Sequence, residues 1–235
     1  GGLRRYDLSI NLRKPQNVPM PMDWQSQLST CQDSAYIDTV SKITGESIPV
    51  LKDYYLNPRD PGDGGNHNHK AFSVLAYDDR IWVGTANGIN KGRIVEEITQ
   101  ISENEFEILS CIEWDHYKYP TNGISGNFVV ALGKQDWNGQ TTIWAATVGT
   151  GEAGEMQGLS YSRDEGVSWK TALIGERVYN IESKDSLVFV STSSGLWKSL
   201  DGENWAKLDP AIEQSMLNQR QILTNVVYAA KIDDR

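Results

Sequence analysis

The sequence predicts an all-β fold made of repeated antiparallel sheets, and three observations lead to this prediction. Six-residue runs rich in apolar and β-branched residues recur, each with an aromatic residue followed three positions later by Thr. Each run has a second strand-like run before it and a Gly turn after it. Between these runs the sequence has no helix of the kind that connects neighbouring parallel strands.

The repeat has three copies, at residues 80–85, 142–147 and 187–192, with Trp82, Trp144 and Phe189 as the shared aromatics. The last two copies are 45 residues apart, which is close to the length of one blade of a β-propeller, about 40 to 50 residues. The first two copies are 62 residues apart, and insertions between them account for the excess.

Each copy follows a predicted inner strand, at residues 71–77, 127–132 and 178–182, and a fourth inner strand is predicted to begin at Asn225. Asp-Asp or Lys-Asp pairs between the inner and second strands are typical hairpin residues. Each unit is therefore predicted to contain four antiparallel strands: an inner strand, the repeated strand, a third strand after the Gly turn, and an outer strand.

The predicted architecture is a β-propeller of four-stranded antiparallel blades, with about three complete blades and partial blades at both ends. Asp209-Pro210 predicts one short helix, because Asp is a good N-cap and Pro suits the first helical position. We expect the 235 residues to be a fragment of a longer chain, and we expect this fragment to self-associate through its open sheet faces. The predicted boundaries are 1–70 for a partial blade with a long insertion, 71–125, 126–175 and 176–215 for blades, and 216–235 for the start of the next.

The composition disfavours some classes of partner and bears on the cellular compartment of the protein. The net charge is −9, which disfavours binding to nucleic acid, and no apolar run is long enough for a membrane-spanning helix. The only cysteines are Cys31 and Cys111. Two unpaired thiols are the favoured interpretation, since disulfide frameworks usually have more cysteines, and a single bridge in an exported protein is the alternative.

Two short motifs predict tight turns between third and outer strands. Residues 162–169 follow the pattern Ser-x-Asp-x-Gly-x-x-Trp, and residues 199–205 follow a version one residue shorter. The Asp carboxylate can accept hydrogen bonds from the turn, the Gly allows a positive φ, and the Trp can pack between sheets. The residues with these structural roles are Ser162, Asp164, Gly166, Trp169, Ser199, Asp201, Gly202 and Trp205.

These motifs resemble the Asp-box, or BNR-like, repeats of sialidases, xyloglucanase-type glycosidases and sortilin-like receptors. Residues 81–91 and 1–6 resemble the propeller repeats of bacterial two-component sensors and related secreted surface proteins. The resemblance covers the chain except roughly residues 10–56. It implies that Asp164 and Asp201 are structural and lie opposite the ligand face. The arginine motif of sialidases, Phe-Arg-Ile-Pro, is absent, so no catalytic residue is assigned.

Long loops on one face of a propeller are the expected ligand site, and they are predicted at 57–70, 113–125, 148–157 and 207–224. One hypothesis is a metal or polar-ligand site. The favoured alternative is that Asx turns and solvated imidazoles shape the loops, because the spacings enforce no metal geometry. No cofactor is expected beyond such a metal. The candidate ligand residues are Asp60, Asp63, His67, His69, Trp114, Asp115, His116 and Tyr117.

The function favoured by these observations is a non-catalytic binding or scaffold module with a carbohydrate or protein ligand. The resemblance implies a secreted or cell-surface bacterial protein, extracellular or periplasmic. An Asp-box glycoside hydrolase and the extracellular sensor domain of a two-component receptor are the alternatives.

Overall fold

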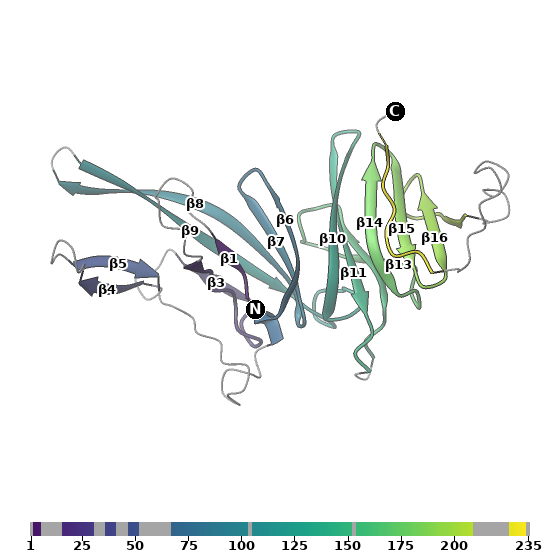
Figure 1. The fold of residues 1–235 in the computed structure, drawn as a ribbon, viewed down its shortest axis with the longest axis horizontal. Helices are drawn as coiled ribbons and strands as arrows, with labels where there is room; N and C mark the ends of the chain where they lie inside the picture. Colours follow the sequence, from purple (N-terminus) through teal and green to yellow (C-terminus); the bar gives the residue numbers. More distant parts are fainter. Residues whose placement is uncertain are drawn as a thin grey trace. The chain divides into compact units, whose positions relative to one another are not determined.

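The computed structural model describes residues 2–5, 16–30, 36–40, 47–51, 67–102, 105–151, 154–208 and 226–233. These residues confirm the all-β prediction, since strands predominate and the one helical element is the short 3-10 helix η2 (His67–His69) (Figure 1). The chain divides into two compact units. The first unit comprises Gly1–Ala71, Ala76–Trp82 and Asn90–His116, and the second comprises Phe72–Leu75, Val83–Ile89 and Tyr117–Arg235.

Two small two-stranded sheets come from the first 51 residues. Strand β1 (Arg4–Arg5) pairs with β2 (Gln16–Asn17), and β4 (Tyr36–Val40) pairs with β5 (Ser47–Leu51). Strand β1 lies within residues 1–6, the segment that resembles a propeller repeat, and it is only two residues long.

A five-stranded sheet has the order β3-β9-β8-β7-β6. Strands β6 and β7 have the bounds predicted for the inner and repeated strands. The sheet differs from the prediction at its outer edge, where β3 adds a fifth strand beside β9 through the pairs Gln27 with Asp115 and Ser29 with Glu113. Its strands are β3 (Gln27–Ser29), β6 (Ala71–Tyr77), β7 (Arg80–Thr85), β8 (Gly88–Ser102) and β9 (Glu105–Tyr117).

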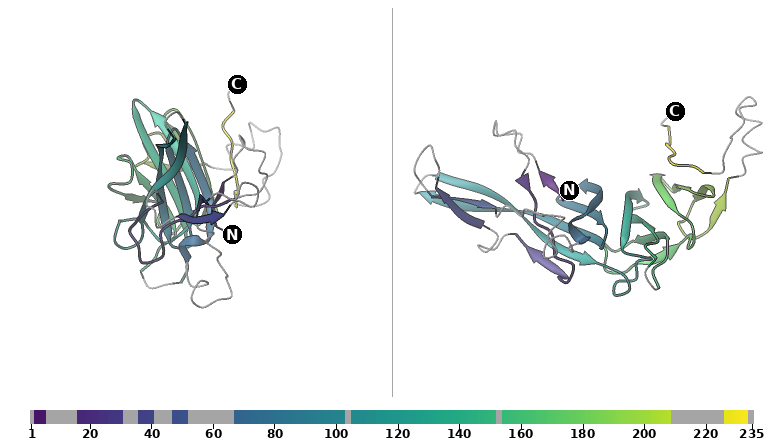
Figure 2. Two further views of the ribbon diagram at one scale, coloured as in Figure 1. Left: turned by 90° about the vertical axis from the view of Figure 1, so that its left-hand side faces the viewer. Right: turned by 60° about the horizontal axis from the view of Figure 1, so that its bottom comes forward.

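Two four-stranded antiparallel sheets follow, each with its strands in chain order. Figures 1 and 2 show these sheets next to each other, with β10 beside β14. The strands predicted at 127–132, 142–147, 178–182 and 187–192 all lie in them. The first sheet contains β10 (Phe128–Trp137), β11 (Gln140–Val148), β12 (Gly158–Ser162) and β13 (Lys170–Ala172), and the second contains β14 (Val178–Lys184), β15 (Leu187–Thr192), β16 (Gly195–Ser199) and β17 (Trp205–Lys207).

The Thr of each repeat has the same role in all three sheets. Its side chain is fully buried, and its hydroxyl donates to the carbonyl of the Gly that begins the third strand. This bond closes the connection between the second and third strands and satisfies a buried hydroxyl. The Oγ1 to O distances are 3.1 Å for Thr85 to Gly88, 3.4 Å for Thr147 to Gly158 and 3.0 Å for Thr192 to Gly195. The Thr147 hydroxyl also lies 3.2 Å from the Met156 carbonyl oxygen, so its donated bond is shared between the two carbonyls.

The apolar core of the second unit fills the space between the two four-stranded sheets. Trp144, on β11, is fully buried and contacts Tyr161 of its own sheet and Trp205 of the next, with ring centroids 5.0 and 6.0 Å apart. A large aromatic side chain therefore wedges one sheet against the next, and its partner Trp205 is the Trp of the second turn motif, which was predicted to pack between sheets. The buried members of this cluster are Trp144, Ala146, Leu159, Tyr161, Val178, Ile181, Val188 and Val190.

The C-terminal segment corrects one prediction. Residues 226–233 form no strand, although an inner strand was expected from Asn225. The segment instead contacts the end of β15, where the Val227 amide donates to the Thr192 carbonyl at 3.0 Å, and β14, where Lys231 pairs with Glu182 at 2.9 Å. A strand needs a continuous ladder of backbone bonds, and these contacts include only isolated ones. The helix predicted at Asp209 lies outside the described residues.

Among the described residues, no helix has the length and apolar character needed to cross a membrane.

Candidate functional site

The segment that contains Trp114, Asp115 and His116 is a strand, so the prediction of a loop at residues 113–125 is wrong for its first five residues. Trp114 and His116 are buried, with 2% and 4% of their surface exposed, and Asp115 between them is only partly buried. This alternation is that of a strand with one buried face, and β3 pairs with it on its outer side. Sequence analysis missed this two-residue period of burial, because a mixture of charged and aromatic residues is also typical of ligand-binding loops.

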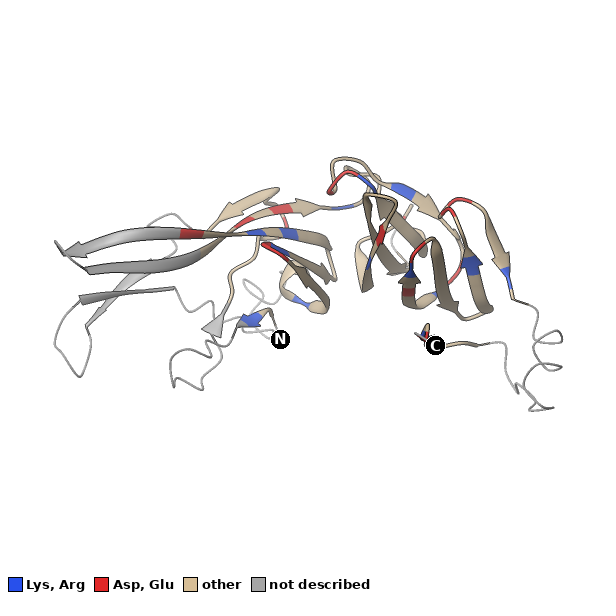
Figure 3. Ribbon diagram, turned by 90° about the horizontal axis from the view of Figure 1, so that it is seen from above, with Lys and Arg blue, Asp and Glu red and all other residues tan. Residues whose placement is uncertain are grey.

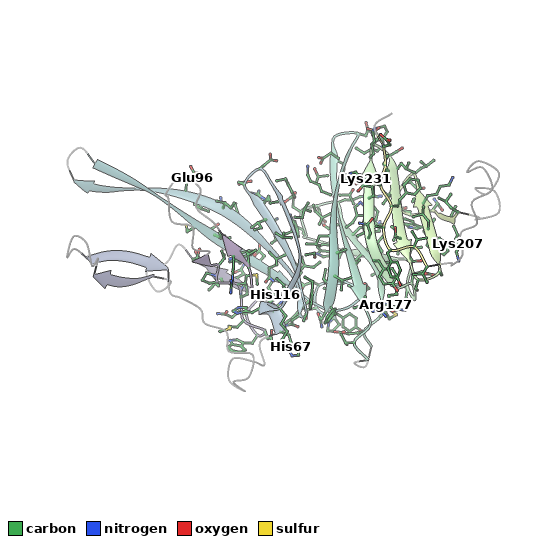
Figure 4. All side chains as sticks on the ribbon, in the orientation of Figure 1. His67, Glu96, His116, Arg177, Lys207 and Lys231 are labelled. Carbon is green, nitrogen blue, oxygen red and sulfur yellow. The ribbon has the colours of Figure 1, made fainter. Side chains whose placement is uncertain are left out.

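The three histidines hold a neighbouring segment of the chain. The Nε2 atom of His69 lies 2.9 Å from the Met20 carbonyl oxygen, and the Nδ1 atom of His116 lies 2.8 Å from the Gln25 carbonyl oxygen. Between these two anchors, the Asp23 carboxylate accepts from the backbone N–H of His67 at 2.9 Å. Figure 4 labels His67 and His116 on their elements. The buried imidazoles are thus engaged in fixing residues 20–25.

A reciprocal amide pair, which sequence reasoning missed, reinforces this arrangement. Asn68 and Asn90 are fully buried, and each side chain donates to the carbonyl oxygen of the other at 2.8 Å. The Asn68 amide also donates to the Pro21 carbonyl at 2.7 Å. Buried amides need such partners, so this pair fixes η2 against β8 and the 20–25 segment. The pair could not be predicted from the sequence, because Asn68 and Asn90 lie on different elements and meet only in the folded structure.

The described candidates do not assemble into a metal-ligand set. Among the described residues, no group of three His, Cys, Asp or Glu side chains is arranged to hold a metal ion. Asp60 and Asp63 lie outside the described residues, so the loop hypothesis that included them stays a prediction.

Tyr117, the last predicted ligand residue, packs against the turn at residues 162–169, which we call the first Ser-Asp turn. Its ring centroid lies 6.1 Å from that of Trp169. A Cβ atom added to Gly166, which has a φ of 88°, would lie 2.8 Å from the tyrosine ring. The turn therefore requires glycine here both for backbone conformation and for space.

Hydrogen bonds inside the first Ser-Asp turn converge on Ser162 and Asp164. The Ser162 hydroxyl donates to the Asp164 carboxylate at 2.8 Å and accepts from the Gly166 amide at 2.8 Å. Asp164 also accepts from the backbone and hydroxyl of Ser168. These bonds, above all the one from the Ser168 hydroxyl, lower the pKa of Asp164 because they stabilise its ionised form.

The second Ser-Asp turn, residues 199–205, repeats this chemistry. The Asp201 carboxylate accepts from the side-chain amide and the backbone N–H of Asn204, both at 2.7 Å. Asn204 and the backbone of Glu203 thereby hold the pKa of Asp201 far below its usual value. Gly202 has a φ of 76°, and a Cβ there would lie 2.7 Å from the Trp144 ring. Both turns therefore have the structural geometry expected from their motifs.

A pocket of about 660 Å³ lies within the first unit, on strands β3, β7, β8 and β9. Such a volume falls in the range of about 300 to 1,000 Å³ found for small-molecule sites. Of the predicted ligand residues that the structure describes, Trp114 and Asp115 line this pocket. The lining residues are Gln25, Gln27, Leu28, Ser29, Arg80, Lys91, Arg93, Glu113, Trp114 and Asp115.

An ion pair, an amide hydrogen bond and a cation–π contact hold polar side chains that line the pocket. Arg93 of β8 pairs with Glu113 of β9, and the Gln27 side chain donates to the Asp115 carboxylate at 2.9 Å. The Lys91 ammonium lies 5.5 Å from the centroid of the Trp82 ring, a cation–π contact that positions it. Figure 3 shows the basic and acidic residues of this sheet mixed along its described strands.

Cys111 takes part in a disulfide bond, so the favoured prediction of two unpaired thiols is wrong. The sequence contains one other cysteine, Cys31, which lies outside the described residues. Cys111 is buried on β9, four residues before Asp115 of the pocket.

No family model, no curated protein and no solved structure matches the chain.

Proposed function

We propose that this chain is a non-catalytic binding module of the β-propeller type, with a saccharide ligand in the pocket of the first unit. The repeated antiparallel sheets, each with the same buried Thr, and the Trp144 wedge between the two four-stranded sheets support the propeller assignment. The two Ser-Asp turns support kinship with Asp-box proteins, because their carboxylates are held by their own turns.

The proposal of a saccharide ligand rests mainly on the polar lining of the pocket. Saccharides present closely spaced hydroxyl groups that both donate and accept hydrogen bonds. The pocket offers amides from Gln25 and Gln27, a hydroxyl from Ser29, and carboxylates from Glu113 and Asp115. Amides and carboxylates can form paired hydrogen bonds with neighbouring hydroxyls.

The state of the carboxylates favours binding over catalysis. Hydrolysis of a glycosidic bond requires two carboxyl groups, one of which is kept protonated by apolar surroundings. Glu113 has a side chain that is 47% exposed and pairs with Arg93, and Asp115 accepts from Gln27. Neither carboxyl group lies in the apolar setting that a general acid needs.

The disulfide at Cys111 supports the proposed location. Disulfides persist in oxidising compartments, which include the extracellular space, the cell surface and the bacterial periplasm. We therefore place the module in a secreted or surface-attached protein.

Calorimetric titration with a panel of oligosaccharides, combined with analysis of released sugars, tests this function. We expect saturable binding without any release of sugar. Asp115→Ala should weaken binding, because it removes a lining carboxylate, and Lys198→Gln on β16 is the matched surface control. Failure of every oligosaccharide to bind would overturn the proposal. Sugar release that is lost in Glu113→Gln would replace it with a glycoside hydrolase.

A further inference from the structure

We propose that Trp24 is a further binding residue for the saccharide, a surface at the rim of the pocket on which a pyranose ring stacks. The saccharide class that such a surface selects is a chain of β-linked pyranose rings with equatorial hydroxyls. This inference rests on the proposed function and deepens it, because it adds a residue and a sugar class that the polar lining does not specify.

Trp24 is the most exposed of the eight tryptophans, with 75% of its surface accessible. An indole left in water forgoes the free energy that burial of its large apolar surface would contribute. Tryptophan also has only two side-chain torsions, so a ligand that packs on it restricts little rotamer freedom. Single exposed apolar residues are common on protein surfaces, so the support that the fold gives this one decides its meaning.

Trp24 lies in a tight turn that two hydrogen bonds close. The Gln25 amide donates to the Met22 carbonyl oxygen at 2.9 Å, and the Met22 amide donates to Oε1 of Gln25 at 2.8 Å. The carboxylate of Asp23, the other central residue of the turn, accepts from two backbone N–H groups of η2 at 2.9 and 2.7 Å. The backbone is therefore held on both sides of the indole.

Buried groups anchor the chain before and after this turn. His69, which is 4% exposed, holds the Met20 carbonyl before it. His116, equally buried, holds the carbonyl of Gln25 at its end. Binding loses less conformational entropy when a contact residue is already ordered in the free protein. The scaffold thus keeps the most exposed tryptophan in a preorganised position, as a binding site requires.

Gln25 joins the turn to the pocket, since it closes the turn and also lines the pocket. Its Cα atom lies about 3.8 Å from that of Trp24. The bond from the Met22 amide engages Oε1 of Gln25 and leaves the NH2 group as the end that donates to a ligand hydroxyl. An oligosaccharide with one ring on the indole can therefore bring its next ring to the amides and carboxylates of the lining.

The sugar class follows from the flat shape of the indole. A pyranose with equatorial hydroxyls turns its axial C–H groups to its two faces, and these groups pack on the electron-rich face of an aromatic ring. A β-1,4 linkage keeps successive rings in one flat ribbon, so the neighbouring ring stays within reach of the polar lining. A furanose has hydroxyl or hydroxymethyl groups on both faces of a smaller ring and offers no such surface.

Calorimetry with two neutral hexasaccharides, cellohexaose and an inulin-type fructan, tests the sugar class. We expect cellohexaose to bind at least about tenfold more tightly than the fructan, because its pyranose rings stack on Trp24. Trp24→Ala should remove this advantage and leave the binding of the fructan unchanged. Trp24→Phe keeps a smaller aromatic face and should weaken the binding of cellohexaose about two- to fivefold.

Trp137→Ala is the matched control, because Trp137 is 50% exposed and lies on β10, which adds no residue to the pocket lining. This variant should bind both probes as the unaltered chain does. Tryptophan fluorescence gives a second readout, since cellohexaose should protect Trp24 from quenching by acrylamide. The protection should be lost in Trp24→Ala and kept in Trp137→Ala. Thermal melting establishes that each variant is folded.

The outcomes distinguish this inference from the proposed function. Saccharide binding that is equally tight in Trp24→Ala and in the unaltered chain would overturn the role of Trp24 and leave the saccharide function standing. A fructan that binds as tightly as cellohexaose would overturn the sugar class alone. Failure of every oligosaccharide to bind would remove both the inference and the proposed function.

Discussion

Arg163 of the first Ser-Asp turn reaches across to the second, where its guanidinium group lies 3.1 Å from the carboxylate of Glu203. The same side chain donates to the Asp201 carbonyl and stacks over the Tyr161 ring at 5.1 Å. One residue thus joins the outer turns of two successive sheets, in addition to the apolar core between them. Burial also raises the pKa of Tyr161, which keeps its ring neutral beneath the guanidinium group.

Replacing Arg163 should loosen this connection. Arg163→Ala removes two hydrogen bonds and the stacked side chain, so we expect the free energy of unfolding in urea to fall by about 1 to 3 kcal/mol. Lys170→Ala is the control, because Lys170 is largely exposed and lies 3.7 Å from the same Glu203 carboxylate. That variant should lose no more than about 0.5 kcal/mol. Equal losses would show that Arg163 acts only as a surface charge.

Gly202 should tolerate substitution much less than a glycine with the same backbone conformation elsewhere. Gly139 has a φ of 75° and open space around its Cα, whereas a Cβ at Gly202 would collide with Trp144. Gly139→Ala should cost about 1 to 2 kcal/mol from the backbone alone. Gly202→Ala should cost about 1 to 3 kcal/mol more, because Trp144 must move. Denaturant unfolding measures both, and a difference near zero would contradict the close packing.

Acid should weaken the turns in a defined direction. The folded-state pKa values of Asp164 and Asp201 are lowered by hydrogen bonds to Ser168 and Asn204. Their contribution to stability is therefore complete above the unfolded pKa, about 3.9, and is lost as the pH falls below it towards the folded values. Unfolding measured from pH 6 to pH 2 should show this loss. The double variant Asp164→Asn with Asp201→Asn should show a flatter profile, and an unchanged profile would assign the acid sensitivity elsewhere.

Reduction should destabilise the protein through the Cys111 disulfide. We expect dithiothreitol to lower the free energy of unfolding by about 2 to 4 kcal/mol and to have no further effect on Cys111→Ser. Peptide mapping without reductant should recover the Cys111 peptide linked to a second peptide. Titration of two free thiols in the native protein would rule out the bond.

Local chemistry explains which parts of the fold could be predicted. Strands β6, β7 and β15 have the predicted bounds because each is a short hairpin arm that ends at turn residues. The two Ser-Asp turns could also be predicted, because all the groups that hold Asp164 and Asp201 lie within a few residues of them. These features depend on neighbours in the sequence.

Contacts between distant residues explain what could not be predicted. Strand β3 is three residues long and exists through pairing with β9, about 85 positions later. The strand character of residues 113–117 was missed because carboxylates beside aromatic residues were interpreted as a ligand-contacting loop, although the buried Trp114 and His116 alternate with polar residues. The pocket is lined by residues from four strands, among them Gln27, Arg80, Lys91 and Asp115. No local sequence pattern indicates that these residues lie close together in the fold.

The most direct test of a saccharide site on strands β3, β7, β8 and β9 is an NMR titration of the isotope-labelled chain with the oligosaccharides of the calorimetric panel. The account predicts saturable shifts of the backbone amides of Gln27, Lys91, Arg93 and Asp115 with at least one probe, and none in the two Ser-Asp turns. Shifts confined to the Ser-Asp turns, or no shift at the pocket with any probe, would contradict it.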